Sequence, residues 1–204
     1  MKITKSIFGK EQEELEKFNK LDLNERSIVF YSEDISSFVH FEQIIHELTE
    51  KMECQICYVT SAEDDPILSN QNKRIRSFYI GLGTARINFF LELKAEVLVM
   101  TMPDLGIYQI KRSRVYPVHY VYVFHSINST HRNYRKNAFD HFDSIFCTGP
   151  HHVEEIIATE QLYNLKRKNL VKCGYGLIDK LQKNKPVKNQ EMCTKDERKK
   201  ILEN

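Results

Sequence analysis

The sequence predicts an α/β domain built on a doubly wound, mainly parallel, Rossmann-like sheet. Two observations support this prediction. Short apolar runs rich in β-branched and aromatic residues alternate with longer amphipathic segments along most of the 204 residues, and such alternation is typical of successive β-α-β units. Most of the apolar runs also lack a polar face, which indicates strands that are covered by helices on both sides.

The individual elements follow from the same periodicity. The first is an amphipathic helix at residues 9–20, where Leu15 and Phe18, followed by Leu21, recur at helical spacing. The predicted strands lie at residues 27–32, 55–60, 77–80, 95–102, 118–124, 144–147 and 170–173. The predicted helices between the strands lie at residues 38–51, 84–93, 131–139 and 151–161, and a polar loop is expected at residues 61–72.

The composition changes near the end of the sequence. From Lys180 onward it is dominated by Lys, Asn, Gln, Pro and Glu, which favours a linker. Thr194 followed by Glu197 is typical of a capping box and predicts the start of a helix. We therefore expect one domain at residues 1–182, with its amphipathic helix within residues 1–22. Residues 183–204 are expected to lead to a further domain that this sequence does not contain.

Composition also limits the function classes. Lys and Arg exceed Asp and Glu by only two charges, so the net charge gives no reason to expect nucleic acid as a partner. The five cysteines are scattered, and the sequence has no N-terminal apolar segment of the secretory type. The longest apolar stretches fall far short of the roughly 20 residues that a bilayer-spanning helix needs. We expect a cytoplasmic protein, with peripheral contact to the inner face of the plasma membrane left open.

The candidate binding residues follow from the predicted sheet. Ligands of open parallel sheets bind beyond the carboxyl ends of the strands. Turns at residues 81–84, 103–106, 125–131 and 148–152 are expected at that edge. They supply the substrate-binding candidates Gly83, Thr84, Asp104, Ser126, Ser129, Thr130, Arg132, His151 and His152.

The helix starts among these turns are candidate phosphate sites. Pro150 at the first position of a helix leaves free backbone N–H groups that could bind a phosphate. A capped helix with two exposed histidines is an equally good interpretation. The basic clusters at residues 111–114 and 132–136 could likewise hold a phosphate or contact anionic lipid headgroups, although most such clusters are solvated faces.

His125 is the catalytic candidate. It follows the most continuous apolar strand and precedes a polar helix start. A neutral imidazole at that place could take a proton from an acceptor hydroxyl, because histidine ordinarily titrates near neutral pH. The alternative is a histidine that is hydrogen-bonded to a loop carbonyl and has no chemical role.

No cofactor and no metal ion is expected. The turn at residues 81–83 reads Gly-Leu-Gly, but Arg86 occupies the third glycine position of the dinucleotide fingerprint, so neither NAD nor FAD is inferred. Cys54 and Cys57 lead into a strand and have no second pair nearby, which favours core cysteines. The eight histidines show no paired-ligand spacing typical of zinc sites.

Three segments together carry a resemblance to a known family. Residues 124–130 read Phe-His-Ser-Ile-Asn-Ser-Thr and resemble an aromatic-His-Gly-Thr motif. Residues 138–152 resemble the strand and the start of the following helix near the acceptor in the same family, and residues 171–181 resemble its closing motif, Gly-Tyr-Pro-Arg-x-Asp. The segment from 124 to 179 is thus similar to the N-terminal domain of CDP-glycerol glycerophosphotransferases, which have a GT-B fold and build teichoic acids and related polymers. The sequence departs from the family pattern at Ser126, which replaces the glycine, and at Gly176-Leu177, which stands where Pro-Arg is usual.

The resemblance implies an acceptor-side half of a transferase in capsule or cell-envelope polymer synthesis. His125 would be the base, the acceptor would be a phosphorylated or lipid-linked carbohydrate, and a CDP-linked or nucleotide-sugar donor would bind to the domain that follows. Isolated residues 1–204 are then expected to lack turnover and tight binding of the donor. Three alternatives stay open: a GT-B sugar glycosyltransferase, a non-catalytic domain that binds phosphorylated carbohydrate, and a dinucleotide-dependent oxidoreductase.

Overall fold

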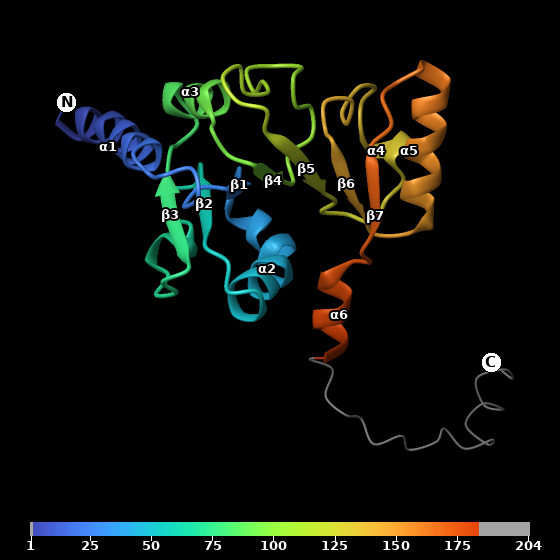
Figure 1. Cartoon of the computed structure of the whole chain (residues 1–204), viewed down its shortest axis with the longest axis horizontal. Helices are drawn as coiled ribbons and strands as arrows, with labels where there is room; N and C mark the ends of the chain where they lie inside the picture. Colours follow the sequence, from blue (N-terminus) through green and yellow to red (C-terminus); the bar gives the residue numbers. More distant parts are fainter. Residues whose placement is uncertain (1, 184–204) are drawn as a thin grey trace, which may run out of the picture.

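The computed structural model describes residues 2–183, with side-chain surroundings given for residues 9–182. Seven parallel strands form one sheet in the order β3-β2-β1-β4-β5-β6-β7 (Figure 1). The strands are β1 (Ile28–Ser32), β2 (Ile56–Thr60), β3 (Ile75–Tyr79), β4 (Val97–Met100), β5 (His119–Val123), β6 (Ser144–Cys147) and β7 (Asn169–Lys172). The predicted doubly wound α/β class is confirmed.

Helices cover both faces of this sheet (Figure 1). They are α1 (Lys2–Asn19), α2 (Phe38–His46), α3 (Thr84–Glu92), α4 (Thr130–Asn133), α5 (Pro150–Tyr163) and α6 (Gly176–Lys183). Shorter turns are η1 (Ile35–Ser37), η2 (Glu47–Lys51) and η3 (Pro66–Ser69). Side chains of α1, α3 and α5 join the core on one face, whereas α2 packs on the other and α6 contacts α2.

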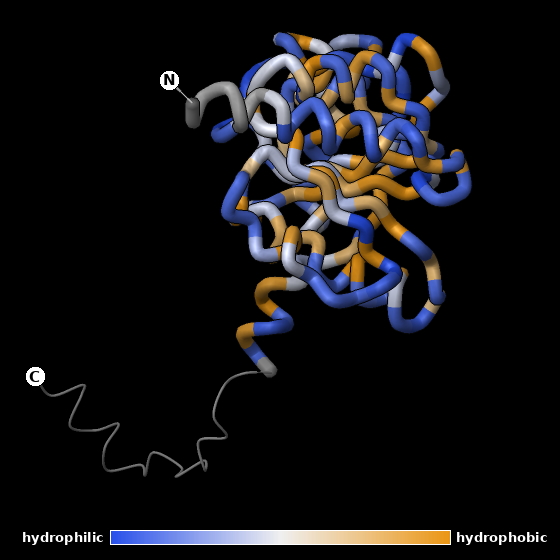
Figure 2. Tube along the Cα trace, turned by 90° about the vertical axis from the view of Figure 1, so that its left-hand side faces the viewer, coloured by the Kyte–Doolittle hydropathy of each residue, from blue (hydrophilic) through white to orange (hydrophobic). Residues whose placement is uncertain are grey.

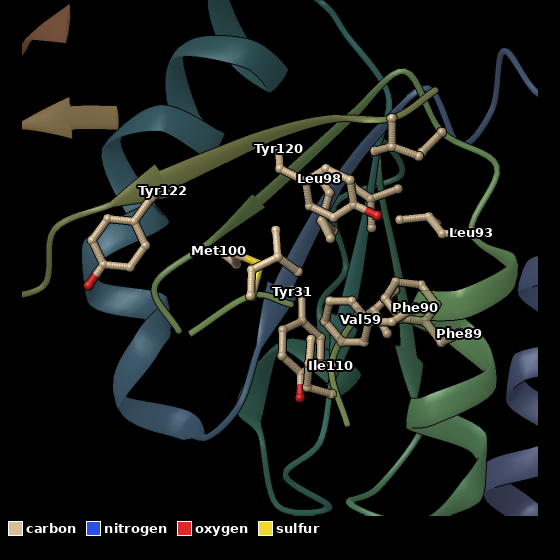
Figure 3. Close-up of a cluster of buried hydrophobic side chains, with 14 of the residues drawn as sticks. Tyr31, Val59, Phe89, Phe90, Leu93, Leu98, Met100, Ile110, Tyr120 and Tyr122 are labelled. Carbon is tan, nitrogen blue, oxygen red and sulfur yellow. The ribbon is translucent and has the colours of Figure 1, made fainter. Parts of the chain in front are cut away.

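The core follows from the alternation of side chains along each strand. On β1, Tyr31 points to the face of α3 and Phe30 to the face of α2, since successive strand residues point to opposite sides. Tyr31 packs edge-to-face on Phe90 at a centroid distance of 4.8 Å, and Figure 3 shows both within the cluster that covers the middle of the sheet. Figure 2 shows apolar strands inside a mostly hydrophilic exterior.

Three sequence expectations about the helices were wrong in extent. The helix expected at residues 131–139 is the single turn α4, after which the chain runs through successive turns with Asn137 at φ 71°. Asn133 and Asn137 favour turns over helix interiors, which explains the early end. The first helix begins at Lys2 instead of residue 9.

The third difference lies at the end of the described chain. Residues 180–183, expected to be linker, form the last turn of α6. Side-chain contacts with α2 hold this helix: Gln43 donates to the carbonyl of Gly176 at 3.4 Å, and Lys180 pairs with Glu42. A helix of eight residues offers little periodicity to a sequence reading. The capping box predicted at Thr194, and Cys193, lie outside the described residues.

Candidate functional site

The strand order places a crevice beside β1. Because β1 lies between β2 and β4, the chain leaves β1 toward one side of the sheet and returns to the other side. Ligands of doubly wound sheets bind outside the carboxyl ends of the strands at such a reversal. A cavity of about 220 Å³ lies at this place, lined by Glu33, Asp34, Ser36, Ser37, His40, Thr101, Met102, Pro103 and His125.

His125 is exposed and lies directly beyond β5, on the wall of this crevice. Gly83 and Pro150 follow the carboxyl-side ends of β3 and β6, and because all strands are parallel these residues share one edge of the sheet with His125. The Tyr175 hydroxyl donates to the backbone carbonyl of His125 at 3.0 Å and fixes the start of the loop. The predicted placement of the imidazole in an open crevice therefore matches the structure.

Two tyrosines orient the ring of His125. The Tyr122 oxygen lies 3.4 Å from His125 Nδ1, and the Tyr122 hydroxyl donates to Tyr134 Oη at 3.4 Å. The Tyr122 oxygen is then the acceptor for an Nδ1–H of His125, a tautomer that leaves Nε2 unprotonated. Burial, and then the neighbouring Tyr134, raise the pKa of Tyr122 well above its ordinary value, so this hydroxyl stays neutral. Tyr122 lies toward the carboxyl end of β5 (Figure 3).

His40 is the second imidazole of the crevice, and the sequence analysis missed it. Its ring centroid lies 6.0 Å from that of His125 at an interplanar angle of 61°, and it stacks on Tyr175 at 5.9 Å. Its Nδ1 is buried and has no hydrogen-bond partner within residues 2–183. Burial, and then the neighbouring His125, lower the pKa of His40. Only the order of the strands brings these two histidines together.

His151 and His152, at the start of α5, bind the backbone of the loop that follows His125. His151 Nε2 donates to the carbonyl of Ile127 at 2.9 Å, and His152 Nε2 donates to the carbonyl of Asn128 at 2.8 Å. His152 is fully buried, and its ring stacks on Phe124 with a centroid distance of 3.8 Å. The expected substrate contact of the His152 side chain is thus wrong, because the ring is fully buried and both of its nitrogens have partners within the protein, Nδ1 with Thr148 Oγ1 at 3.1 Å.

A carboxylate also occupies the start of α4. The backbone N–H and the hydroxyl of Thr130 both donate to Glu155 Oε2 at 2.6 Å, and Thr130 is buried. Burial alone would raise the pKa of Glu155, but hydrogen bonds from Thr130 and Ser129 outweigh it and hold the pKa below its ordinary value. Thr130 and Ser129 therefore bind an internal anion here, which contradicts the expected direct contact of Thr130 with substrate.

The glycine turn before α3 is filled in the same way. Gly81 has φ +59°, and a Cβ at this position would lie 1.9 Å from Oε1 of Glu11, which projects from α1. The Tyr79 hydroxyl donates to the same carboxylate oxygen at 3.4 Å. Glu11 Oε2 lies 3.5 Å from the corresponding position of Gly83. A phosphate at Gly83 and Thr84, as the sequence suggested, would compete with this buried carboxylate.

The other candidates, Asp104, Ser126 and Arg132, are not among the residues that line the crevice. Asp104 adopts φ 66° just beyond Pro103, and its Oδ2 lies 3.2 Å from Nε of Arg135. Asp104 Oδ1 and Ser126 Oγ are buried and lack a hydrogen-bond partner among the described residues. Arg132 is exposed on α4. Ser126 thus follows His125 in the chain and Asp104 follows Pro103 of the crevice lining, but neither side chain is among the residues that line the crevice.

Comparison with known proteins adds no identity. No family model, no curated protein and no solved structure matches the chain. Between residues 2 and 183 no helix has the length and apolar character to cross a membrane. The same range contains no group of three or more His, Cys, Asp or Glu side chains arranged to hold a metal ion. The function is therefore argued from the crevice itself.

Proposed function

We propose that this chain is the acceptor-side domain of a transferase similar to CDP-glycerol glycerophosphotransferases, with His125 as the general base in the synthesis of a capsule or cell-surface polymer. The observation that carries this proposal is the position of His125: it lies at the crevice beside β1 with Nδ1 toward Tyr122, which leaves Nε2 as the nitrogen that can accept a proton. An oriented imidazole at the edge of a cavity is the arrangement that general-base catalysis needs.

The proposed reaction is a single group transfer. An acceptor hydroxyl gives its proton to Nε2 of His125, and its oxygen forms a bond to the phosphorus of the glycerol phosphate group of the donor. The phosphoanhydride bond of the donor breaks, and CMP leaves with the electron pair. The imidazolium that forms keeps its Nδ1–H on the Tyr122 oxygen, and the carboxylates of Glu33 and Asp34 in the same crevice stabilise its positive charge.

The charges around the crevice favour a hydroxyl group over a phosphate at this point. Glu33 and Asp34 line it, and Asp34 Oδ1 accepts hydrogen bonds from the backbone N–H and the hydroxyl of Ser36 at 2.9 and 2.6 Å. A phosphate bound against these carboxylates would be repelled. The crevice is thus suited to the nucleophilic end of an acceptor, and we assign the CDP-linked or nucleotide-sugar donor to a second domain.

The filled glycine turn speaks against the oxidoreductase alternative. Dinucleotides bind with their pyrophosphate on the helix start that follows a glycine turn. Here Glu11 occupies that turn, and Arg86 Nη1 lies 3.5 Å from Oε1 of Glu33. Addition of NADH to the chain is expected to leave its fluorescence unchanged.

The test is a substitution in the complete enzyme. For His125→Ala we expect turnover to fall by roughly 10²-fold or more, the typical contribution of a general base. His131→Ala is the matched control, because His131 is exposed near the same edge and is not among the residues that line the crevice. Unchanged turnover of His125→Ala would remove the base assignment. Calorimetry of residues 1–204 with CDP-glycerol should show no micromolar binding, and a micromolar dissociation constant would place the donor site in this chain.

A further inference from the structure

We propose that His40 is a second substrate-binding residue of the crevice, and that its ring and the ring of His125 hold the same acceptor hydroxyl between them. The inference rests on the proposed function, because it assumes that a hydroxyl group enters the crevice. It adds a residue from α2, 85 positions away from His125 in the chain, that is not among the candidates the sequence predicts.

The backbone fixes His40 opposite His125 from two sides. Asp34 accepts from the N–H of Ser36 and caps η1, which turns the chain from β1 into α2. The hydroxyl of Thr101, beyond β4, donates to Ser37 Oγ at 3.2 Å in a buried bond. These contacts tie the start of α2 to the ends of two neighbouring strands, so His40, the third residue of the helix, has a defined position.

The gap between the two rings suits one small polar group. The centroids are 6.0 Å apart and the rings are steeply inclined at 61°. A hydroxyl oxygen with hydrogen bonds of about 2.8 Å to each ring spans nitrogens up to about 5.6 Å apart. The crevice at this point has a volume of about 220 Å³ and is open to solvent at His125. Because both histidines line this crevice, the proposal places the acceptor hydroxyl between one nitrogen of each ring.

The buried nitrogen of His40 sets the direction of its hydrogen bond. Nδ1 has no partner within the described part of the chain, and a buried N–H without an acceptor is rarer and more costly than an under-used acceptor. The proton of the neutral ring is therefore placed on Nε2. Since burial and then His125 keep the pKa of His40 low, the ring stays neutral while His125 takes up the proton. Nε2–H of His40 then donates to the hydroxyl oxygen, and the hydroxyl donates to His125.

Tyr175 joins the two histidines on the remaining side. Its ring stacks on His40 at 5.9 Å with an interplanar angle of 22°, and its hydroxyl bonds to the His125 carbonyl at 3.0 Å. The carboxylates of Glu33 and Asp34 also line the crevice. Burial lowers the pKa of His40 more than Asp34 raises it. One tyrosine thus contacts both the ring of His40 and the backbone of His125.

The test uses the chain of residues 1–204 with ¹⁵N-labelled histidine. The side-chain nitrogen signals are followed by NMR during titration with glycerol and, separately, with glycerol 3-phosphate. We expect the signals of His40 and His125 to shift together with one dissociation constant for each probe. His40→Phe should weaken binding by roughly 3- to 10-fold, which corresponds to one lost hydrogen bond. His40→Gln, which keeps an N–H donor, should recover most of the affinity.

His46→Phe is the matched control, because His46 is exposed at the end of the same helix and is not among the residues that line the crevice. This variant should bind the probes like the unchanged chain. Shifts of His125 alone, or wild-type affinity in both His40 variants, would overturn the role of His40 and leave the proposed base in place. Probes that shift neither ring would overturn both proposals. Circular dichroism of each variant establishes that it is folded, and the joint shift in the unchanged chain tests the proposal without any variant.

Discussion

Replacing Thr130 with valine tests how the His125 loop is held. Val has nearly the same shape as Thr and keeps the backbone N–H bond to Glu155, so the change removes only the hydroxyl bond of 2.6 Å. Hydrogen bonds to charged groups contribute about 1.5–3 kcal/mol to stability. Glu155 is partly solvated and keeps its bonds from the Thr130 N–H and from Ser129. We therefore expect Thr130→Val to lower the free energy of unfolding by about 1–2 kcal/mol.

The assay is urea unfolding followed by circular dichroism, since the chain has no tryptophan. The pKa of Glu155 is lowered in the folded state, so this carboxylate stabilises the fold above its ordinary value of 4.5 and loses that effect as the pH falls through the folded pKa. The difference between Thr130→Val and the unchanged chain should be largest at pH 6–7, about two units above that value, and shrink in acid. Equal unfolding midpoints at neutral pH would refute the anchoring role. A double-mutant cycle with Glu155→Gln should show a coupling energy above roughly 0.5 kcal/mol.

Three further changes test other parts of the site. Tyr122→Phe removes the acceptor of His125 Nδ1. We expect the turnover of the proposed enzyme to fall by roughly 3- to 10-fold, and the free energy of unfolding to change by less than about 1.5 kcal/mol. Unaltered turnover would exclude an orienting role. His152→Ala removes a bond of 2.8 Å and a buried stack and should lower stability by about 2–4 kcal/mol in thermal unfolding; a loss below about 0.5 kcal/mol would contradict the packing argument. Gly81→Ala places an L-residue at φ +59° with its Cβ against Glu11, and it should lower the free energy of unfolding by at least about 1–2 kcal/mol. Adding Glu11→Ala in the same chain should restore only the part of this loss that is due to the clash.

The fold could be predicted because its signal is local. Most strands are apolar runs, β3 and β7 being the exceptions, and the predicted helices carry apolar residues at helical spacing. Both signals can be recognised in the sequence without knowledge of the spatial neighbours. The position of His125 was predictable for the same reason: it is the residue after a strand, and in a parallel sheet that is the ligand edge. The helix expected at residues 131–139 was overextended, because its apolar spacing arises from turns that pack Phe139 on Tyr122 at a centroid distance of 4.9 Å.

The remaining site residues depend on contacts that the sequence does not display. His40 lies within an ordinary amphipathic helix, and it faces His125 only because β1 is followed in space by β4 and β5. Glu11 and Glu155 carry no motif, yet Glu11 fills the glycine turn that appeared free for phosphate and Glu155 binds the start of α4. An empty anion site and one that is already occupied by a distant glutamate have the same local sequence.

The internal carboxylate of Glu11 has a practical consequence for ligand screening. Helix α1 supplies this group from the beginning of the chain, and the rest of the glycine turn belongs to β3 and α3. A shortened protein that starts at β1 would lose this carboxylate, together with Leu15 and Phe18 of the core, and would leave the glycine turn and the start of α3 open to anions. Sulfate, nucleotides and polyphosphates would then bind where the native molecule already holds its own counterpart. Affinity for such compounds measured on a truncated form would result from the loss of α1 and would not identify a natural substrate.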